Sequence, residues 1–218
     1  MKTKHLLVAA LMMAVCVGAN AQEAEGPGPH SSNLYVGFTP FAMRNIKLSE
    51  KDVIDYRYKY KSAWGLQVNY EKQFKSSFAT LWELQYSNAK LDEIDYKKVP
   101  TDASLLPDEV KDMYAIAVKG YFGRILNNYK TVQFPIYVGL GVEYINAEAM
   151  HHAFLTIGFK ARVKCYVSDN IALYAGVNGE LGGSDMSIPH YTGSKKDPSY
   201  DLLNKNGYID VGVVIGLK

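Results

Sequence analysis

The segment Gly-Tyr-Ile-Asp-Val-Gly-Val-Val-Ile-Gly-Leu-Lys, residues 207–218, stands at the end of the chain and alternates between two kinds of side chain. Its odd positions are aliphatic, and its even positions are mostly small or polar. The aliphatic set is Ile209, Val211, Val213, Ile215 and Leu217, and the other set is Tyr208, Asp210, Gly212, Val214 and Gly216. Successive side chains of a β-strand point to opposite faces, so this period of two predicts a strand with one continuous apolar face.

The same alternation recurs seven times before this segment, which predicts eight strands in all. The predicted strands cover about 33–44, 56–74, 78–90, 114–122, 132–143, 155–165, 171–181 and 207–217. Pro40 predicts a β-bulge in the first of them, because proline removes a backbone donor from the ladder. Eight is an even number, which suits the closure of an antiparallel barrel.

The connections between the predicted strands fall into two classes. Short ones near 75–77, 125–130 and 168–170 alternate with longer ones after the first, third and seventh strands, and with a shorter segment near 146–152. Short turns at one end and long loops at the other are the pattern of outer-membrane barrels, in which the turns are periplasmic and the loops extracellular.

Three tyrosines precede the apolar face of the second strand. Tyr56, Tyr58 and Tyr60 have the same parity as Trp64, which predicts that all four lie on one outward face with the basic side chains of 57, 59 and 61 opposite. A strand of this length exceeds an apolar band of about 25 Å, so we expect its hairpin to project beyond a membrane. The tyrosines are candidate loop contacts, either a binding edge for a partner strand or anionic lipopolysaccharide, or an ordinary aromatic girdle.

The beginning of the chain has the form of a secretory signal peptide. Two lysines precede an apolar run, and Ala19-Asn20-Ala21 supplies a small-x-small cleavage site. We therefore expect three segments: a cleaved signal peptide at 1–21, a disordered leader at 22–32 and a barrel domain at 33–218. The apolar run is too short to span a bilayer as a helix, which takes about 20 residues.

Composition narrows the possible partners. Removal of the signal peptide leaves 22 basic and 22 acidic residues. This neutral balance does not suggest a nucleic-acid partner. One cysteine, Cys165, remains after cleavage, so no internal disulfide can form. Seventeen tyrosines and eighteen glycines suit a barrel with aromatic girdles and a crowded interior.

The polar face decides which side of the barrel meets lipid. Its glycines suit the narrow interior of an eight-stranded barrel, where small residues must stand beside long ones. Four acids and four bases share this face: Glu71, Glu83, Glu143 and Asp210 with Lys119, Lys160, Arg162 and Lys164. Because these charges balance, we expect an internal ion-pair network that plugs the barrel. The alternatives are a narrow path for small solutes, and a soluble lipocalin-like barrel with the apolar face inward.

Taken together, the signal peptide, the eight strands, the loop asymmetry and the last strand resemble the small bacterial outer-membrane β-barrel proteins of the OmpA and OmpX class. The closer likeness is to the Bacteroidota type, whose strands often read like 136–142 here. The resemblance implies an all-β, eight-stranded antiparallel up-and-down transmembrane β-barrel. In that family the last strand is the signal for the barrel-assembly machinery, and Asp210, Gly212, Ile215 and Leu217 match its pattern. The family usually ends on an aromatic residue, whereas Leu217 is followed by Lys218.

The resemblance further implies a protein of the bacterial outer membrane, with membrane lipid and the assembly machinery as partners. An extracellular ligand or host surface would be met through the loops, and no cofactor or metal is expected. A lipid-modifying enzyme of the deacylase or acyltransferase type is the alternative, with His151, His152 or His190 at its site. We favour a non-enzymatic barrel because the chain has no Gly-x-Ser-x-Gly or similar motif around a nucleophile.

Overall fold

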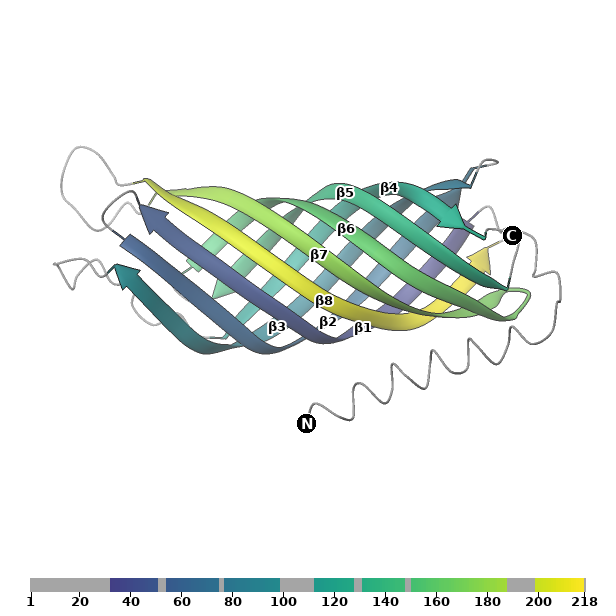
Figure 1. The fold of residues 1–218 in the computed structure, drawn as a ribbon, viewed down its shortest axis with the longest axis horizontal. Helices are drawn as coiled ribbons and strands as arrows, with labels where there is room; N and C mark the ends of the chain where they lie inside the picture. The colour runs from purple at the N-terminus through teal and green to yellow at the C-terminus, as the bar shows by residue number, and fades with distance from the viewer. Residues whose placement is uncertain are drawn as a thin grey trace.

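The computed structural model describes residues 32–50, 54–74, 77–98, 112–127, 131–147, 150–187 and 199–217. Eight strands make up nearly all of these ranges (Figure 1). They are β1 (Ser32–Glu50), β2 (Ile54–Gln73), β3 (Phe78–Lys98), β4 (Met113–Leu126), β5 (Val132–Ala147), β6 (Met150–Ser168), β7 (Ile171–Ser187) and β8 (Ser199–Leu217). The predicted signal peptide and all but the last residue of the predicted leader lie outside the described residues.

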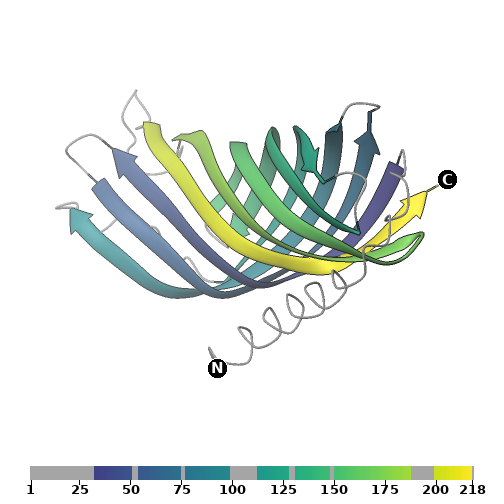
Figure 2. The ribbon, with the colours of Figure 1, turned by 45° about the vertical axis from the view of Figure 1, so that its right-hand side comes forward.

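The strands form one closed barrel in which each is antiparallel to its neighbours in the chain. β8 closes the ring by pairing with both β7 and β1, for example through Val213, which lies opposite Val36 and Leu173. Figure 2 shows the strands curving around a common axis with a strong tilt. The eight-stranded antiparallel up-and-down barrel predicted from the sequence is therefore confirmed. Within the described ranges, no helix has the length and apolar character needed to cross a membrane.

Most strands are longer than predicted, β1, β3 and β8 among them. β1 continues to Glu50 and β2 begins at Ile54, so only residues 51–53 connect them. The long loop expected between these strands is wrong, because its residues extend the ladder from Arg44–Tyr60 up to Glu50–Ile54. The strands β3 and β4 are joined through 99–112, and β7 and β8 through 188–198. We call this end of the barrel the loop side, and the end with the connections 74–77, 127–131 and 169–170 the turn side.

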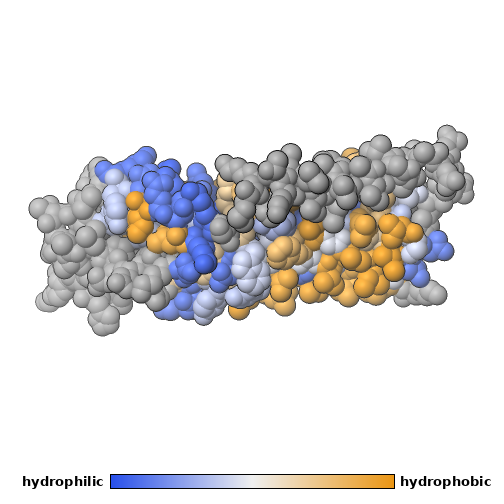
Figure 3. All heavy atoms as spheres, turned by 90° about the horizontal axis from the view of Figure 1, so that it is seen from below, coloured by the Kyte–Doolittle hydropathy of each residue, from blue (hydrophilic) through white to orange (hydrophobic). Residues whose placement is uncertain are grey.

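A band of exposed apolar side chains surrounds the barrel nearer the turn side. Figure 3 shows it in orange, with hydrophilic residues in blue over the loop-side part of the same view. This apolar belt includes Val36, Phe38, Leu66, Val68, Trp82, Leu84, Ile116, Val118, Val138, Leu140, Leu155, Ile157 and Val177, all well exposed. β2 has 20 residues, and a strand of that length, tilted by about 40°, spans roughly 50 Å, twice the height of an apolar belt of about 25 Å. The barrel therefore extends well beyond the belt on the loop side.

The interior, or lumen, is packed at the turn-side end. A buried cluster of tyrosine and aliphatic side chains fills it: Tyr35, Ala79, Leu81, Tyr121, Ile125, Tyr137, Tyr166, Ala172, Tyr174 and Val214. Small residues make the room that these rings occupy. A Cβ atom on Gly37 would clash with the hydroxyl of Tyr174, and one on Gly212 would meet the backbone of β1. Glycine at these two places therefore allows a tyrosine ring to lie across the β1–β8 seam.

Candidate functional site

Ten charged side chains are buried in the lumen among the described residues. Five are acids and five are bases: Glu71, Glu83, Glu143, Glu180 and Asp210 with Arg44, Lys119, Lys160, Arg162 and Lys164. The structure thus places all eight side chains of the predicted lumen network inside the barrel. It adds Glu180 and Arg44, which keep the two signs equal. Equal numbers matter here, because an unpaired charge in a low-dielectric interior is very unfavourable.

Arg162 and Asp210 form the centre of the network. A guanidinium Nη2 of Arg162 donates to Oδ2 of Asp210 at 2.7 Å, and the carboxylate also accepts from Asn178 at 2.8 Å and from Gln67 at 2.5 Å. The guanidinium lies over two aromatic rings, 4.8 Å from the centroid of Tyr174 and 5.2 Å from that of Tyr35. A planar cation over an aromatic ring gains cation–π attraction in addition to its ion pair. Arg162 is therefore held from several strands at once.

Two lysines connect this centre to the acids on neighbouring strands. Lys160 pairs with Glu83 at 2.8 Å, and Lys119 pairs with Glu180 at 2.6 Å. Tyr208 links the two pairs, because its hydroxyl accepts from Lys160 at 2.7 Å and donates to Glu180 at 2.8 Å. These contacts join β3, β4, β6, β7 and β8 across the lumen. A chain of charge-assisted hydrogen bonds of this kind holds these strands together across the lumen.

Glu71 is the acidic group of the turn-side end. Its carboxylate accepts from Asn33 at 2.6 Å, from Tyr35 at 2.6 Å and from Gln73 at 2.9 Å, and it also accepts from Tyr137. Lys164 completes the set with an ion pair at 3.5 Å. The carboxylate is thus saturated with donors and has no free lone pair aimed at solvent.

Arg44 and Glu143 form a separate pair nearer the loop side. Arg44 donates to Glu143 at 2.6 Å, and Asn204 donates to the other carboxylate oxygen at 2.7 Å. Simple parity from Tyr35 would point Arg44 outward, so sequence reasoning missed it. The bulge predicted at Pro40 was the available signal, since one extra residue reverses the facing of everything that follows.

That reversal is present in both β1 and β2. The ladder register shifts between Thr39 and Ala42 in β1, and between Lys61 and Trp64 in β2. On the turn side of these bulges the polar residues face the lumen and the apolar residues face outward. On the loop side these two strands place mainly apolar side chains inward and charged ones outward, which is the pattern of a soluble barrel.

The prediction for Tyr56, Tyr58 and Tyr60 is therefore wrong in its facing. All three are buried in the lumen, with exposures of 0%, 1% and 2%. Their parity relative to Trp64 is broken by the extra residue between Tyr60 and Ala63, which period-two counting did not include. They cannot offer their rings as an outward binding edge or girdle in this arrangement.

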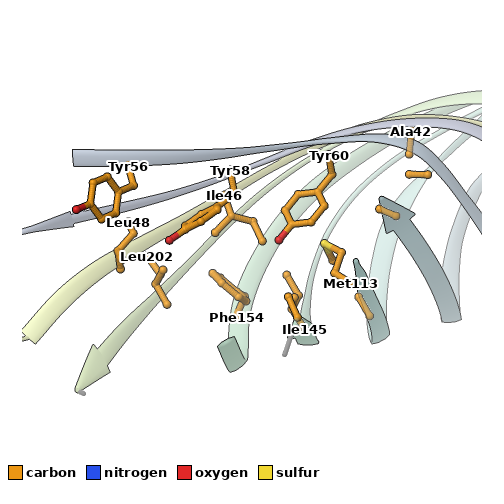
Figure 4. Packing of buried hydrophobic residues seen from close by; sticks show 14 of the residues in the cluster. Ala42, Ile46, Leu48, Tyr56, Tyr58, Tyr60, Met113, Ile145, Phe154 and Leu202 are labelled. Carbon is orange, nitrogen blue, oxygen red and sulfur yellow. The ribbon is translucent and has the colours of Figure 1, made fainter. Parts of the chain in front are cut away.

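The three tyrosines instead form the top of an apolar cluster across the lumen (Figure 4). This upper plug consists of Ala42, Ile46, Leu48, Tyr56, Tyr58, Tyr60, Ala63, Ala89, Met113, Ala115, Ile145, Ala147, Phe154, Leu202 and Tyr208. In the figure the tyrosine rings point from β2 toward Phe154, Ile145 and Met113 on the opposite wall. Burial of so many apolar side chains would itself stabilise the extended loop-side wall.

The outer surface of the same region carries paired charges. Lys47 lies 3.5 Å from Asp55, Lys59 lies 3.1 Å from Glu93, and Lys61 lies 2.6 Å from Asp92. We call these outward pairs on β1, β2 and β3 the charged collar. Charges of this kind belong in water, so the collar marks a part of the barrel outside a lipid bilayer.

The candidate catalytic histidines do not form a common group in the described residues. His151 is exposed on the outer face of β6, whereas the next residue, His152, faces inward with its ring 6.5 Å from that of Phe154. Burial, and secondly the charge of His151, lowers the pKa of His152. His190 lies outside the described residues. Nor do the described residues bring three or more His, Cys, Asp or Glu side chains together as a metal site.

The proposed assembly signal lies on the closing strand. Asp210 is buried and points into the lumen, whereas Ile215 and Leu217 are exposed on the outer face. Gly212 lies opposite Gly37 at the seam with β1. The segment thus combines residues that pack inside or at the seam with residues on the exposed outer face. Its role as an assembly signal stays a prediction.

Several solved structures are similar to this barrel. OprG, an outer membrane protein from Pseudomonas aeruginosa, is 8% identical with a TM-score of 0.59, and the match covers 88% of this chain and 98% of OprG. Neisserial surface protein A is 12% identical with a TM-score of 0.46, covering 87% and 99%. The outer membrane protease OmpT from Escherichia coli is 6% identical with a TM-score of 0.46, covering 90% and 99%. At such identities the likeness to OprG shows the fold alone. No family model and no curated protein matches the sequence.

Proposed function

We propose that this protein is a non-enzymatic barrel of the bacterial outer membrane whose closed lumen makes it a rigid, non-conducting support for extracellular loops. The apolar belt would lie in the bilayer, with the turn side in the periplasm and the loop side outside the cell. The likeness to outer-membrane barrels supports this placement, as do the belt and the collar. The loops and the collar would then make the contacts with a ligand or a host surface.

One observation carries the proposal: buried side chains of different kinds occupy the lumen at two levels. The buried charges other than the Arg44–Glu143 pair lie in the part inside the belt, and the upper plug lies in the part above it. A channel for small solutes would need a continuous wet path through both. A plugged barrel gains stiffness, and stiffness in the collar holds the loop ends at fixed separations, which lowers the entropic cost of binding a partner.

Location and closure can be tested together. The mature protein should appear in the outer-membrane fraction, and its unheated form should migrate differently from the boiled form on an SDS gel. Release with the soluble periplasm, without any heat shift, would mean that the apolar face is not lipid-facing and that the proposal is wrong.

Conductance tests the plug itself. Purified protein in a planar bilayer should give no conductance steps, and a variant with Tyr58→Gly and Lys160→Ala should open small steps because it removes one bulky side chain from each level. Discrete steps from the unaltered protein would favour the narrow porin instead.

The enzymatic alternative has its own test. The opposite facing of His151 and His152 supports a non-catalytic role for that pair, because a nucleophile, its base and an orienting group must converge on one point. Alanine at 151, 152 and 190 together should leave the lipid profile of the membrane unchanged. A change in acylation in that triple variant would contradict the non-enzymatic proposal.

A further inference from the structure

The outer wall of β6, β7, β8 and β1 carries a groove of about 630 Å³. Gly207 on β8 forms its floor, with Met43 of β1 on one side and Gly179 of β7 on the other. Gly179 is not open, because the ring of Phe159 on β6 lies over it, where a Cβ would clash. The groove exists because β8 lacks a side chain at Gly207, between the long side chains of Met43 and Phe159.

One end of the groove is apolar and lies within the belt. Phe159 and Val138 are 52% and 62% exposed there, next to Ile157. Val138 lies in the turn-side half of its strand, so this end is at the depth of acyl chains rather than of headgroups. An exposed, hollowed apolar surface at that depth fits a hydrocarbon chain.

The other end is polar and basic. Lys205 and Asn45 lie opposite each other in the row nearest the loop side, and both line the groove. Lys205 is exposed and forms no ion pair with any residue in the part of the chain that the structure describes, unlike Lys47 of the collar. A lysine in this position attracts an anionic headgroup at the membrane surface, and it does so by about 1 kcal/mol even without a dedicated pocket.

We propose that this groove binds lipid A, the acylated phosphosugar of the outer leaflet, with an acyl chain over Gly207 and against the ring of Phe159, and a phosphate at Lys205. The proposal rests on the proposed function, because the loop side must face the outer leaflet for this lipid to be present. The apolar end of the groove lies deeper in the membrane than its basic end. Lipid A has the same arrangement, with its acyl chains in the membrane and its phosphates nearer the cell exterior. Asn45 can donate its side-chain amide to the same phosphate.

The structure offers a matched pair of glycines for the test. A Cβ on Gly207 would find only the carbonyl oxygen of Asn178 at 3.9 Å, and Gly183 on β7 has nothing within 4 Å. Neither has a backbone conformation that strains an ordinary residue. Gly207→Leu therefore fills the groove without disturbing the wall, and Gly183→Leu adds the same side chain to the outer face one outward position nearer the loop side than Lys205, at a residue that does not line the groove. Lys205→Gln removes the charge, and Lys90→Gln removes an exposed loop-side lysine on β3.

Binding can be measured by native mass spectrometry of the folded protein in neutral detergent, titrated with bis-phosphorylated lipid A. The unaltered protein should retain one lipid. Lys205→Gln should weaken binding about tenfold, the effect expected when a hydrogen bond to a charged group is lost. Gly207→Leu should weaken it at least as much, and the two control variants should bind as the unaltered protein does.

Two results would overturn the assignment. Equal binding by all four variants would mean that the groove does not hold the lipid. Displacement of lipid A by an equal concentration of phosphatidylglycerol would mean a general anionic-lipid surface rather than a lipid A site. The heat shift of each variant on an SDS gel is recorded in parallel, so a failure to form the closed barrel, which would contradict the proposed function, is seen separately from a failure to bind lipid.

Discussion

The buried ion pair of Arg162 and Asp210 makes a quantitative prediction about stability. Asp210→Asn keeps the size of the side chain but removes the charge that lies 2.7 Å from the guanidinium. At an effective dielectric constant of about 20, two unit charges at that distance attract by roughly 6 kcal/mol before desolvation is subtracted. The only other carboxylate paired with Arg162 is that of Glu83, at 3.8 Å, among the residues the structure describes.

The expected cost of Asp210→Asn is about 3 to 5 kcal/mol, because the cation is left buried without its closest partner. Asp55→Asn is the matched control. Asp55 pairs with Lys47 at 3.5 Å, but their side chains are 26% and 35% exposed in the collar. Water and salt screen such a pair, so its loss should cost at most about 1 kcal/mol.

Urea unfolding in phosphatidylcholine vesicles would measure both costs. Trp64 and Trp82 are 41% and 60% exposed on the outer face, so their fluorescence reports the loss of lipid contact. A double variant with Arg162→Met and Asp210→Leu should be more stable than Asp210→Asn alone, because it removes both charges. The reasoning is refuted if the buried and the collar variants cost the same, or if the double variant is the least stable.

Three further predictions concern other parts of the barrel. Tyr60→Phe should raise the free energy of unfolding by about 1 kcal/mol, because the Tyr60 hydroxyl is buried without a hydrogen-bond partner among the described residues. Tyr35→Phe should lower it by about 1.5 to 3 kcal/mol, because it removes a donor to the Glu71 carboxylate. Urea titration would contradict this pair of predictions if both variants changed the free energy of unfolding in the same direction. Leu140→Lys, at a position 61% exposed in the belt, should cost about 2 to 4 kcal/mol in vesicles, and a cost near zero would place that position outside the bilayer. NMR titration should give His152 a pKa below its usual value, so the folded state takes up the proton at a lower pH than the unfolded state does, and stability falls as pH drops below about 6.5. His151→Ala should raise the pKa of His152 only in part, because burial is the larger cause of the lowering. A return of this pKa to its usual value in that variant would contradict burial as the larger cause.

Much of the fold could be predicted because the relevant information is local. Alternation at period two identified the strands, and the sign of each face followed from which residue types can meet lipid. Lys119, Lys160 and Lys164 could be assigned to the lumen for that reason alone, since each would be very unfavourable in a bilayer. The strand count and the antiparallel order then left few alternatives to a closed barrel.

The candidate site was harder to predict because its details depend on contacts between distant strands. Which acid pairs with which base depends on shear and on which strands face each other across the lumen, and no local pattern gives either. Glu180 had the right parity, yet its partnership with Lys119 joins β7 to β4. The groove at Gly207 likewise arises only because Met43, Gly207 and Phe159, from three different strands, lie in one row.

The sequence by itself determined the architecture, the polarity of the wall within the belt and the need for a balanced interior, because side-chain alternation and transfer energies act residue by residue. Only the tertiary structure decided what happens above the belt. There, one extra residue in each of β1 and β2 reverses the facing of the wall, so Arg44 and Tyr58 enter the lumen and the charged pairs turn outward. A bulge is fixed by how two ladders fit together, and a single-residue shift with such large consequences leaves only a weak trace, such as Pro40, in the sequence.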